Sequence, residues 1–237
     1  MQRYFAKQKI DNQLILNKED IYHIKTVMRM DEHDKIQVVY GTKVYLCCLE
    51  NVNTNIQIMV EKELEVKENR MPKITLLIPL LKEQKMDLIL QKATELGVNK
   101  IIPIETERSI IKRKEEKEDK KLERWKRICK EASEQSYRID IPEILPIQNP
   151  KNMKMLEGLS LICSTTETQR NIRFVLNSNT TCDRINIAIG PEGGFSPLEE
   201  KKWNELGFIS VSLGNRIMRV ETVPMYILSV LNFYYME

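Results

Sequence analysis

Two segments that contain glycine follow short apolar runs, and their residue types could form a ligand site. Residues 190–196 (Gly-Pro-Glu-Gly-Gly-Phe-Ser) come directly after the apolar run 185–189, and residues 213–219 (Leu-Gly-Asn-Arg-Ile-Met-Arg) follow the run 209–213. Glycine allows positive φ angles and a close approach of the backbone to a ligand. Open α/β sheets bind ligands beyond the carboxyl ends of their strands. A tight turn into a helix with Ser196 as its N-cap explains the first segment equally well.

An arginine at the end of the second glycine segment and a glutamate two residues later flank the start of an expected apolar helix. Arg219 and Glu221 lie in the stretch 219–224 (Arg-Val-Glu-Thr-Val-Pro). The alternative role for Glu221 is a favourable interaction with the dipole of that helix. Neither glycine segment has the Gly-Lys-Ser/Thr of a P-loop or the G-x-G-x-x-G of a dinucleotide site. Walls lined by backbone at two strand ends suit a neutral nucleoside better than a polyphosphate.

The elements that position these segments alternate between strand and helix from Lys73 onward. The expected strands are the apolar runs 74–80, 98–104, 159–163, 185–189 and 209–213. The expected helices cover residues 86–96, about 120–137, about 197–206, and 221 to the C-terminus. Alternating strands and helices predict an α/β fold with a mostly parallel sheet that is covered on both faces.

The first 72 residues predict a small β domain around one helix. Strands are expected at 12–16, 35–40, 43–49 and 56–60, which suits a compact barrel. Asn17 is the expected N-cap of the helix. Its apolar stripe is expected to consist of Ile21, Ile24, Val27 and Met28. The charge-rich stretch 61–72 ends in Pro72, where we place the domain boundary.

Composition restricts the possible partners. The 237 residues carry a net charge of 37 − 34 = +3, so a nucleic-acid site must be a local patch. Residues 112–127 hold nine Lys/Arg and five Asp/Glu, a local 9 − 5 = +4. This stretch is either a solvated helix or loop, or a basic flap that contacts RNA phosphates.

The sequence also predicts a location and a metal content. It has no run of eighteen apolar residues and no signal-peptide layout at its start, which predicts a cytoplasmic protein without a membrane span. Five scattered cysteines and two histidines lack the spacing of zinc ligands. We therefore expect no metal, and reduced cysteines that pack as small hydrophobic side chains.

The glycine segments and the residues after them resemble a known family. Ile-Gly-Pro-Glu-Gly-Gly-Phe-Ser (189–196) and Leu-Gly-Asn-Arg-Ile-Met-Arg-Val-Glu-Thr (213–222) are similar to motifs of the RsmE family of ribosomal RNA uridine N3-methyltransferases, in the SPOUT superfamily. Further segments resemble the family in the same order, namely residues 22–29, 91–98, 105–109 and 124–138. The resemblance therefore covers nearly the whole chain.

The resemblance implies a fold and an activity. Residues 1–72 would form a PUA-like RNA-binding β-barrel, and residues 73–237 a SPOUT methyltransferase domain with a deep trefoil knot. The enzyme would be a homodimer that transfers a methyl group from S-adenosylmethionine to N3 of a uridine. The family target is uridine 1498 of 16S ribosomal RNA in the small ribosomal subunit, and the product is 3-methyluridine.

The resemblance also implies site residues. Arg219 would stabilise the uracil anion and Glu221 would accept the N3 proton, although an ion pair is an alternative role for Glu221. The expected cofactor-binding residues come from three loops: Thr165, Thr166, Gly190, Glu192, Gly193, Gly194, Leu213, Gly214, Ile217, Met218 and Arg219. The expected RNA contacts are Arg3, Arg29, Arg108, Arg124 and Arg138.

Two other functions remain open on the sequence. A non-catalytic RNA-binding or ribosome-assembly factor could keep the fold, although it would have no need of a cofactor pocket. The same chemistry could also act on another RNA, such as transfer RNA.

Overall fold

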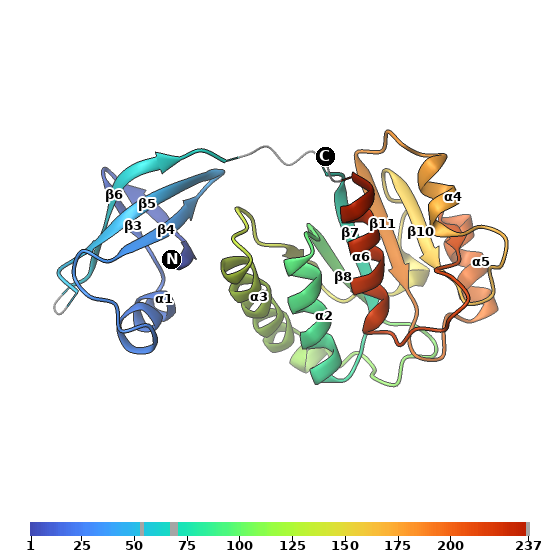
Figure 1. Cartoon of the computed structure of the whole chain (residues 1–237). Coiled ribbons are helices and arrows are strands. Elements are labelled where there is room, and N and C mark those ends of the chain that lie inside the picture. Colours follow the sequence, from blue (N-terminus) through green and yellow to red (C-terminus); the bar gives the residue numbers. More distant parts are fainter. Residues whose placement is uncertain (53–54, 67–70, 236–237) are drawn as a thin grey trace. The chain divides into compact units, whose positions relative to one another are not determined.

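The structure is a computed structural model that describes residues 1–52, 55–66 and 71–235 (Figure 1). By its internal contacts the chain divides into two compact units. Unit 1 consists of Met1–Asn69 and Ser133–Asp140, and unit 2 of Arg70–Ala132 and Ile141–Glu237. In the described residues, no helix has both the length and the apolar character that crossing a membrane requires.

Unit 1 is built on a curled six-stranded sheet with the order β1-β4-β5-β6-β3-β2. β1 pairs with β4 in parallel, and the other neighbours are antiparallel. The edge strands β1 and β2 are joined by only Ala6 and Lys7, so the sheet must curl round, as the expected barrel requires. The strands are β1 (Arg3–Phe5), β2 (Gln8–Ile10), β3 (Gln13–Ile15), β4 (Lys35–Tyr40), β5 (Lys43–Glu50) and β6 (Gln57–Leu64).

The helix of unit 1 begins as the sequence predicts and then departs from the expected stripe. The side chain of Asn17 accepts a hydrogen bond of 2.8 Å from the amide of Asp20, which caps α1 (Lys18–Tyr22). The next turn, η1 (His23–Val27), is a π-helix. Because a π-turn holds more residues than an α-turn, side chains that share a face at α-helical spacing are rotated apart. Ile24 is buried, but Val27 and Met28 are exposed, so their assignment to the stripe was wrong.

Unit 2 contains a six-stranded sheet in which every pair of neighbouring strands is parallel, so the expected α/β architecture is confirmed (Figure 1). The order is β12-β10-β11-β7-β8-β9. The strands are β7 (Lys73–Pro79), β8 (Lys100–Ile104), β9 (Glu143–Ile144), β10 (Leu159–Cys163), β11 (Arg184–Ile189) and β12 (Ile209–Val211).

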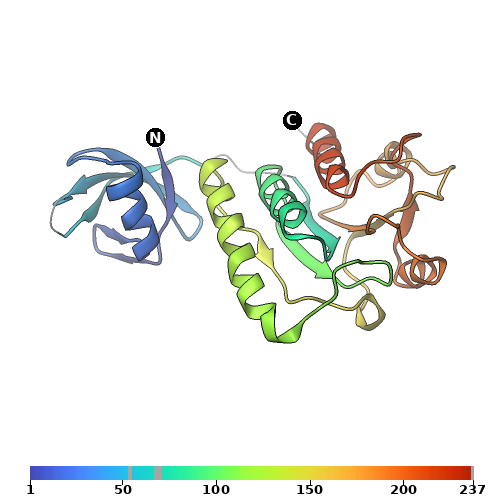
Figure 2. The same ribbon diagram turned by 90° about the horizontal axis from the view of Figure 1, so that it is seen from below.

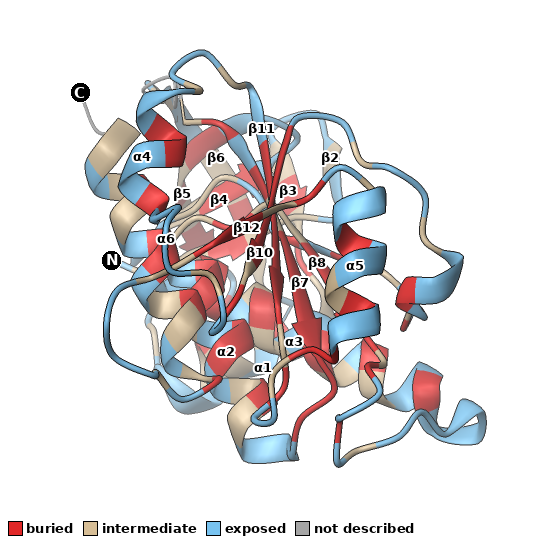
Figure 3. Cartoon of the chain, turned by 90° about the vertical axis from the view of Figure 1, so that its right-hand side faces the viewer, coloured by how far each residue is buried: buried red, intermediate tan, exposed pale blue. Residues whose placement is uncertain are grey.

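Helices cover both faces of this sheet. Alternate residues of β7 face opposite ways: Ile74 and Leu76 belong to a core with α2, α3, α4 and α6, whereas Leu77 packs with Trp203 of α5. Figure 3 shows α5 across the buried strands from α4 and α6, and α2 lies beside α3 in Figures 1 and 2. The helices are α2 (Glu83–Glu95), η2 (Glu115–Lys117), α3 (Glu118–Gln135), η3 (Pro150–Asn152), α4 (Ile172–Asn177), α5 (Pro197–Glu205) and α6 (Thr222–Tyr235).

The parallel pairing brings distant loops to one edge of the sheet. β10 pairs with β12 on one side and with β11 on the other, and β11 also pairs with β7. The loops that leave the carboxyl ends of these strands are therefore neighbours. They include both glycine segments and the loop that carries Thr165 and Thr166. The short elements β9 and α4 are further features that the sequence did not predict.

Candidate functional site

The first glycine segment folds tightly back on itself after β11. A Cβ atom on Gly190 would lie 3.1 Å from Cδ2 and from the backbone nitrogen of Phe195. The amide of Gly194 donates a 2.8 Å hydrogen bond to the carbonyl of Pro191, and Gly194 has a φ of +67°. Side chains are tolerated poorly at both glycines, because one is crowded and the other has a left-handed backbone.

A helix cap ends the same segment. The Ser196 hydroxyl accepts a hydrogen bond from the amide of Glu199, and the Glu199 carboxylate accepts one of 2.9 Å from the amide of Ser196. This reciprocal capping box begins α5, with Pro197 in its first turn. The predicted cap is therefore confirmed, and the loop before it still presents backbone to the strand edge.

The second glycine segment is open and partly apolar. Gly214 has a φ of +114°, and a Cβ there would meet no atom within 4 Å. Ile217 is 88% exposed, while Leu213 and Met218 are half-buried. The exposed Ile217 and the half-buried Met218 beside it form an apolar surface on which a flat ring could pack. Arg219 is also exposed.

The loop after β10 separates the two threonines expected at the site. A Cβ on Gly194 would lie 3.8 Å from the hydroxyl oxygen of Thr165, so Thr165 lies against the glycine segment. The Thr166 hydroxyl instead contacts Ser164 at 2.9 Å and Glu200 at 3.3 Å. In this arrangement Thr165 is better placed than Thr166 to touch a ligand beside the glycine segment.

An ion triad that the sequence did not predict joins the first turn of α2 to the loop after β11 and to the residue before α6. The Lys85 ammonium, in the first turn of α2, lies 3.0 Å from Oε1 of Glu192 and 3.2 Å from Oε2 of Glu221. A hydrogen bond from its own amide, with further help from Lys85 and Arg219, lowers the pKa of Glu221. Burial alone would raise the pKa of Glu192, but the hydrogen bond from Lys85 leaves it lowered. Both carboxylates are therefore ionised at neutral pH.

Arg108, expected to contact RNA, holds the glycine segment. Its Nη1 donates to the carbonyl of Gly193 at 2.8 Å and to that of Phe195 at 3.2 Å. A Cβ on Gly193 would also be 3.5 Å from Cδ of Arg108. The sequence predicts an RNA contact at Arg108 because this residue flanks the basic stretch, and no pattern in the sequence indicates its contacts with the glycine segment.

The other four arginines are divided between the two units. Arg124, in unit 2, pairs with Glu83 and Asp87 of α2. Arg3, Arg29 and Arg138 belong to unit 1, where Arg3 donates to the side chain of Gln37 at 3.1 Å and to the carbonyl of Arg138 at 3.2 Å. Arg138 also pairs with Asp140 at 3.0 Å, and Arg29 is exposed. The structure therefore brings Arg3 and Arg138 together, while Arg108 and Arg124 have separate partners in unit 2.

The basic stretch 112–127 is largely structured and contains internal ion pairs. It includes η2 and the first half of α3. Arg113 pairs with Glu118 at 2.7 Å, and Lys126 pairs with Glu123 at 2.8 Å. These pairs offset part of the local positive charge, which favours the solvated helix over a basic flap.

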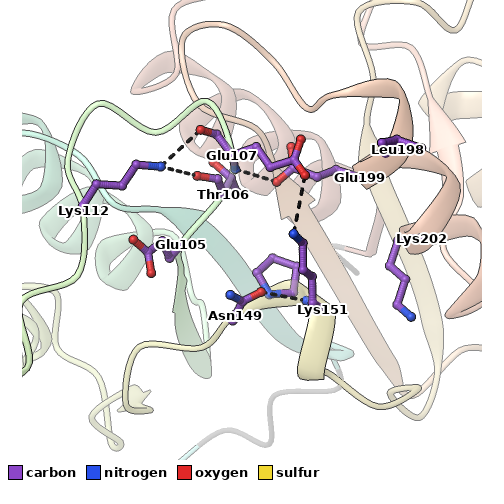
Figure 4. A pocket seen from close by; sticks show the side chains of 10 residues that line it. Glu105, Thr106, Glu107, Lys112, Asn149, Lys151, Leu198, Glu199 and Lys202 are labelled. Carbon is purple, nitrogen blue, oxygen red and sulfur yellow. Dashed lines mark hydrogen bonds and ion pairs between the residues drawn. The ribbon is translucent and has the colours of Figure 1, made fainter.

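A pocket of about 480 Å³ opens beside α5 (Figure 4). The Glu107 amide donates a 2.8 Å hydrogen bond to Glu199, and the Lys112 ammonium donates to the carbonyls of Thr106 and Glu107. Lys202 points away from these hydrogen bonds in Figure 4. The lining of the pocket comes from three segments that are distant in the sequence: Glu105, Thr106, Glu107, Lys112, Asn149, Pro150, Lys151, Leu198, Glu199 and Lys202. Because these segments meet only in the fold, no pattern in the sequence indicated the pocket.

Within the described residues, no three His, Cys, Asp or Glu side chains come together as metal ligands would. The groups that the structure places at this edge are the glycine backbone, the exposed apolar residues and the charged groups around Lys85.

Comparison with known proteins identifies the family. Residues 67–232 match the model of an RNA methyltransferase domain, and residues 16–58 match that of an RNA methyltransferase PUA domain. The chain is 32% identical to ribosomal RNA small subunit methyltransferase E of Bacillus subtilis, covering 98% of this chain and 96% of that protein. It is 34% identical to the protein of the same name from Mesomycoplasma hyopneumoniae, covering 97% and 98%.

A solved structure agrees with these sequence relationships. The crystal structure of ribosomal RNA small subunit methyltransferase E from Neisseria gonorrhoeae, bound to S-adenosylmethionine, is 29% identical in sequence. It superimposes with a TM-score of 0.84 over 98% of this chain and 97% of that one. The full-length matches and the two domain models together show that this chain belongs to the RNA methyltransferase family of ribosomal RNA small subunit methyltransferases E.

Proposed function

We propose that this protein transfers the methyl group of S-adenosylmethionine to N3 of a uridine in 16S ribosomal RNA, within the small ribosomal subunit. The expected product is 3-methyluridine, at the position equivalent to uridine 1498. The observation that carries the proposal is the meeting of three loops at one strand edge, in a chain whose Neisseria gonorrhoeae relative binds S-adenosylmethionine. This edge is where parallel α/β sheets bind ligands.

The three loops fit a bent nucleoside cofactor. The segment 190–196 offers backbone at Gly193 and Gly194, without side chains that would keep a ligand away. The exposed Ile217 and half-buried Met218 offer an apolar wall for an adenine ring. When bound, S-adenosylmethionine supplies an electrophilic methyl group on a positively charged sulfur.

The charged groups at the start of α6 suit the second half of the reaction. Uracil N3 must lose its proton before it can attack, which leaves negative charge on the ring. We assign Arg219 to stabilise that charge and Glu221 to accept the proton. The lowered pKa of Glu221 keeps it ionised and ready to accept, but also makes it a weak base. Stabilisation of the uracil anion by Arg219 therefore contributes much of the lowering of the reaction barrier.

RNA would be held by more than one surface. N3 lies on the pairing edge of uracil, so the target base must be unpaired or flipped out. We assign the pocket beside the first turn of α5 to a nucleotide of the RNA, because it offers lysine donors, carboxylate acceptors and the exposed Leu198. The candidate phosphate contacts are Arg3, Arg29, Arg124 and Arg138. Arg108 instead acts by holding the glycine segment in place.

The family relationship supports three further proposals. Residues 1–72 form the RNA-binding domain and residues 73–237 the methyltransferase domain, the latter with a trefoil knot. The active form is a homodimer. The protein works in the cytoplasm, where its ribosomal substrate is found.

The proposal is tested by methyl transfer from labelled S-adenosylmethionine to small ribosomal subunits that lack the modification. Free 16S RNA and bulk transfer RNA are run alongside, and the labelled nucleoside is identified by mass mapping. We expect label as 3-methyluridine in the RNA of the subunit. Label confined to transfer RNA would identify a different substrate, and no label on any RNA, from a folded protein, would support a binding or assembly factor instead.

A further inference from the structure

We propose that Lys85 is a positioning residue of the methyl-transfer site, whose ammonium group holds the carboxylates of Glu192 and Glu221 together. This inference rests on the proposed function for its catalytic meaning. Its electrostatic part can be tested on the protein alone.

The first argument is geometric. Lys85 lies in the first turn of α2, Glu192 lies in the loop after β11, and Glu221 directly precedes α6. One ammonium group reaches both carboxylates, at 3.0 and 3.2 Å. Lys85 therefore links the glycine segment, which would contact the cofactor, to the start of α6, which would contact the target base.

The second argument is the state of Glu221. Its side chain is only 17% exposed, and its Oε2 is buried and makes no hydrogen bond of good geometry within the described residues. A carboxylate oxygen in that position needs a nearby positive charge in place of lost water. Lys85 supplies that charge at 3.2 Å.

The third argument is the set of charges around the triad. Besides Lys85, the positive groups that act on these carboxylates are Lys82, which acts on Glu192, and Arg219, which acts on Glu221. Without Lys85, Glu192 and Glu221 would lose the charge between them and would repel each other. The pKa of Glu221 would then rise, because the exposed Arg219 is its remaining positive neighbour.

The experiment compares wild-type protein with Lys85→Met, Lys85→Arg and the control Lys92→Met. Lys92 lies on the same helix, where it pairs with Glu95 at 2.9 Å. Carboxyl titration by NMR, without cofactor or RNA, follows Glu192 and Glu221. We expect both pKa values to rise in Lys85→Met, and to stay near wild type in Lys85→Arg and Lys92→Met. Unchanged titration of Glu221 in a folded Lys85→Met protein would overturn the proposal.

The second readout is the pH profile of methyl transfer. A rise in the pKa of Glu221 moves the acid limb of kcat/KM to higher pH, because the ionised carboxylate is then lost sooner as pH falls. We expect kcat/KM to fall about tenfold on the acid limb in Lys85→Met for each unit by which the pKa of Glu221 rises, and to change little at neutral pH, where the carboxylate is ionised in both proteins. Lys85→Arg should recover most of the rate, which a purely steric role for the lysine stem would not explain.

The two readouts separate this proposal from the proposed function. If wild-type protein methylates no RNA, the proposed function fails, while the titrations still decide what Lys85 does. If wild-type protein is active and Lys85→Met keeps both its rate and its acid limb, the positioning role is wrong. If Lys85→Met does not fold, Lys85→Arg decides: recovery of the wild-type titration and pH profile supports the role, and a loss of activity without any shift in titration opposes it.

Discussion

The guanidinium of Arg108 donates a 2.8 Å hydrogen bond to the carbonyl oxygen of Gly193. The same nitrogen reaches the carbonyl of Phe195 at 3.2 Å, so one side chain from the loop after β8 fixes the turn after β11. Arg108, which the sequence predicts as an RNA contact, therefore stabilises the conformation of the expected cofactor loop.

Replacing Arg108 by Ala or Lys should weaken S-adenosylmethionine binding more than RNA binding. Both variants lose the Nη1 donor that reaches two carbonyls, and the shorter lysine side chain keeps the charge without placing a donor at that position. We expect the cofactor Kd to rise about 3–10-fold, as for a partly exposed charged hydrogen bond. Calorimetric titration measures this, with the exposed Arg173→Ala of α4 as the control. A rise confined to the KM for RNA would return Arg108 to the RNA contacts.

A methyl group at Gly190 should disturb the same turn from within. Gly190→Ala places Cβ 3.1 Å from Phe195, tighter than ordinary packing. We expect a loss of about 1–3 kcal/mol in the free energy of unfolding, as for an overpacked core, together with weaker cofactor binding. Urea unfolding and calorimetry test both.

The control for that variant is Gly41→Ala in unit 1. Gly41 has a φ of +62°, and a Cβ there meets no atom within 4 Å. It should cost about 1–2 kcal/mol from left-handed backbone strain alone and leave cofactor affinity unchanged. Equal cofactor affinities in the two variants would mean that the turn at Gly190 does not shape the cofactor site.

Charge reversal at Lys202 should weaken RNA binding where reversal at its neighbour does not. Lys202 lines the pocket in Figure 4, whereas the exposed Lys201 on the same helix is not part of the lining. At low salt we expect Lys202→Glu to raise the KM for RNA about 3–10-fold and Lys201→Glu to have little effect. Cofactor affinity should be unchanged in both. Equal effects of the two reversals would argue for general surface charge and against a nucleotide in the pocket.

Glu167 should contribute stability that disappears in acid. Its carboxylate accepts hydrogen bonds from the amides of Gln169 and Arg170, at 2.8 and 3.1 Å. These backbone bonds lower the pKa of Glu167 from 4.5 to about 2. A lowered pKa stabilises the fold above the unfolded value, and the contribution is lost as pH falls through the folded value. Glu167→Gln should therefore unfold at lower urea than wild type at pH 7, with the difference vanishing between about pH 4.5 and 2.

The matched control is Glu157→Gln, whose side chain is 86% exposed. It should leave the urea midpoint unchanged at every pH, because exposed pairs contribute little. A difference between wild type and Glu167→Gln that stays constant with pH would show that the carboxylate charge is not what stabilises this loop.

Local signals in the sequence predicted much of the fold. The N-caps at Asn17 and Ser196 each depend on neighbours a few residues away. β1 and β2 were missed because each has three residues of mixed polarity. They are strands only because they pair with β4 and β3.

The site divides in the same way. That loops after parallel strands would meet at one edge followed from the order of strands and helices. The partner of Glu221 did not, because Lys85 precedes Glu192 by 107 positions and only the assembled sheet brings the three charges together. The charge of residues 112–127 likewise could not reveal that Arg113 and Lys126 pair with acids of their own stretch.

The place of β11 in the sheet has a consequence for how the protein is made. β7 and β10 are synthesised first, yet they do not touch as neighbours, because β11 lies between them. A ribosome-bound chain that has not yet released residues 184–189 has an open slot in the middle of its sheet, with pairing edges on both sides. The glycine segment can therefore take its shape only late in translation, which leaves a window for aggregation or chaperone binding at that slot.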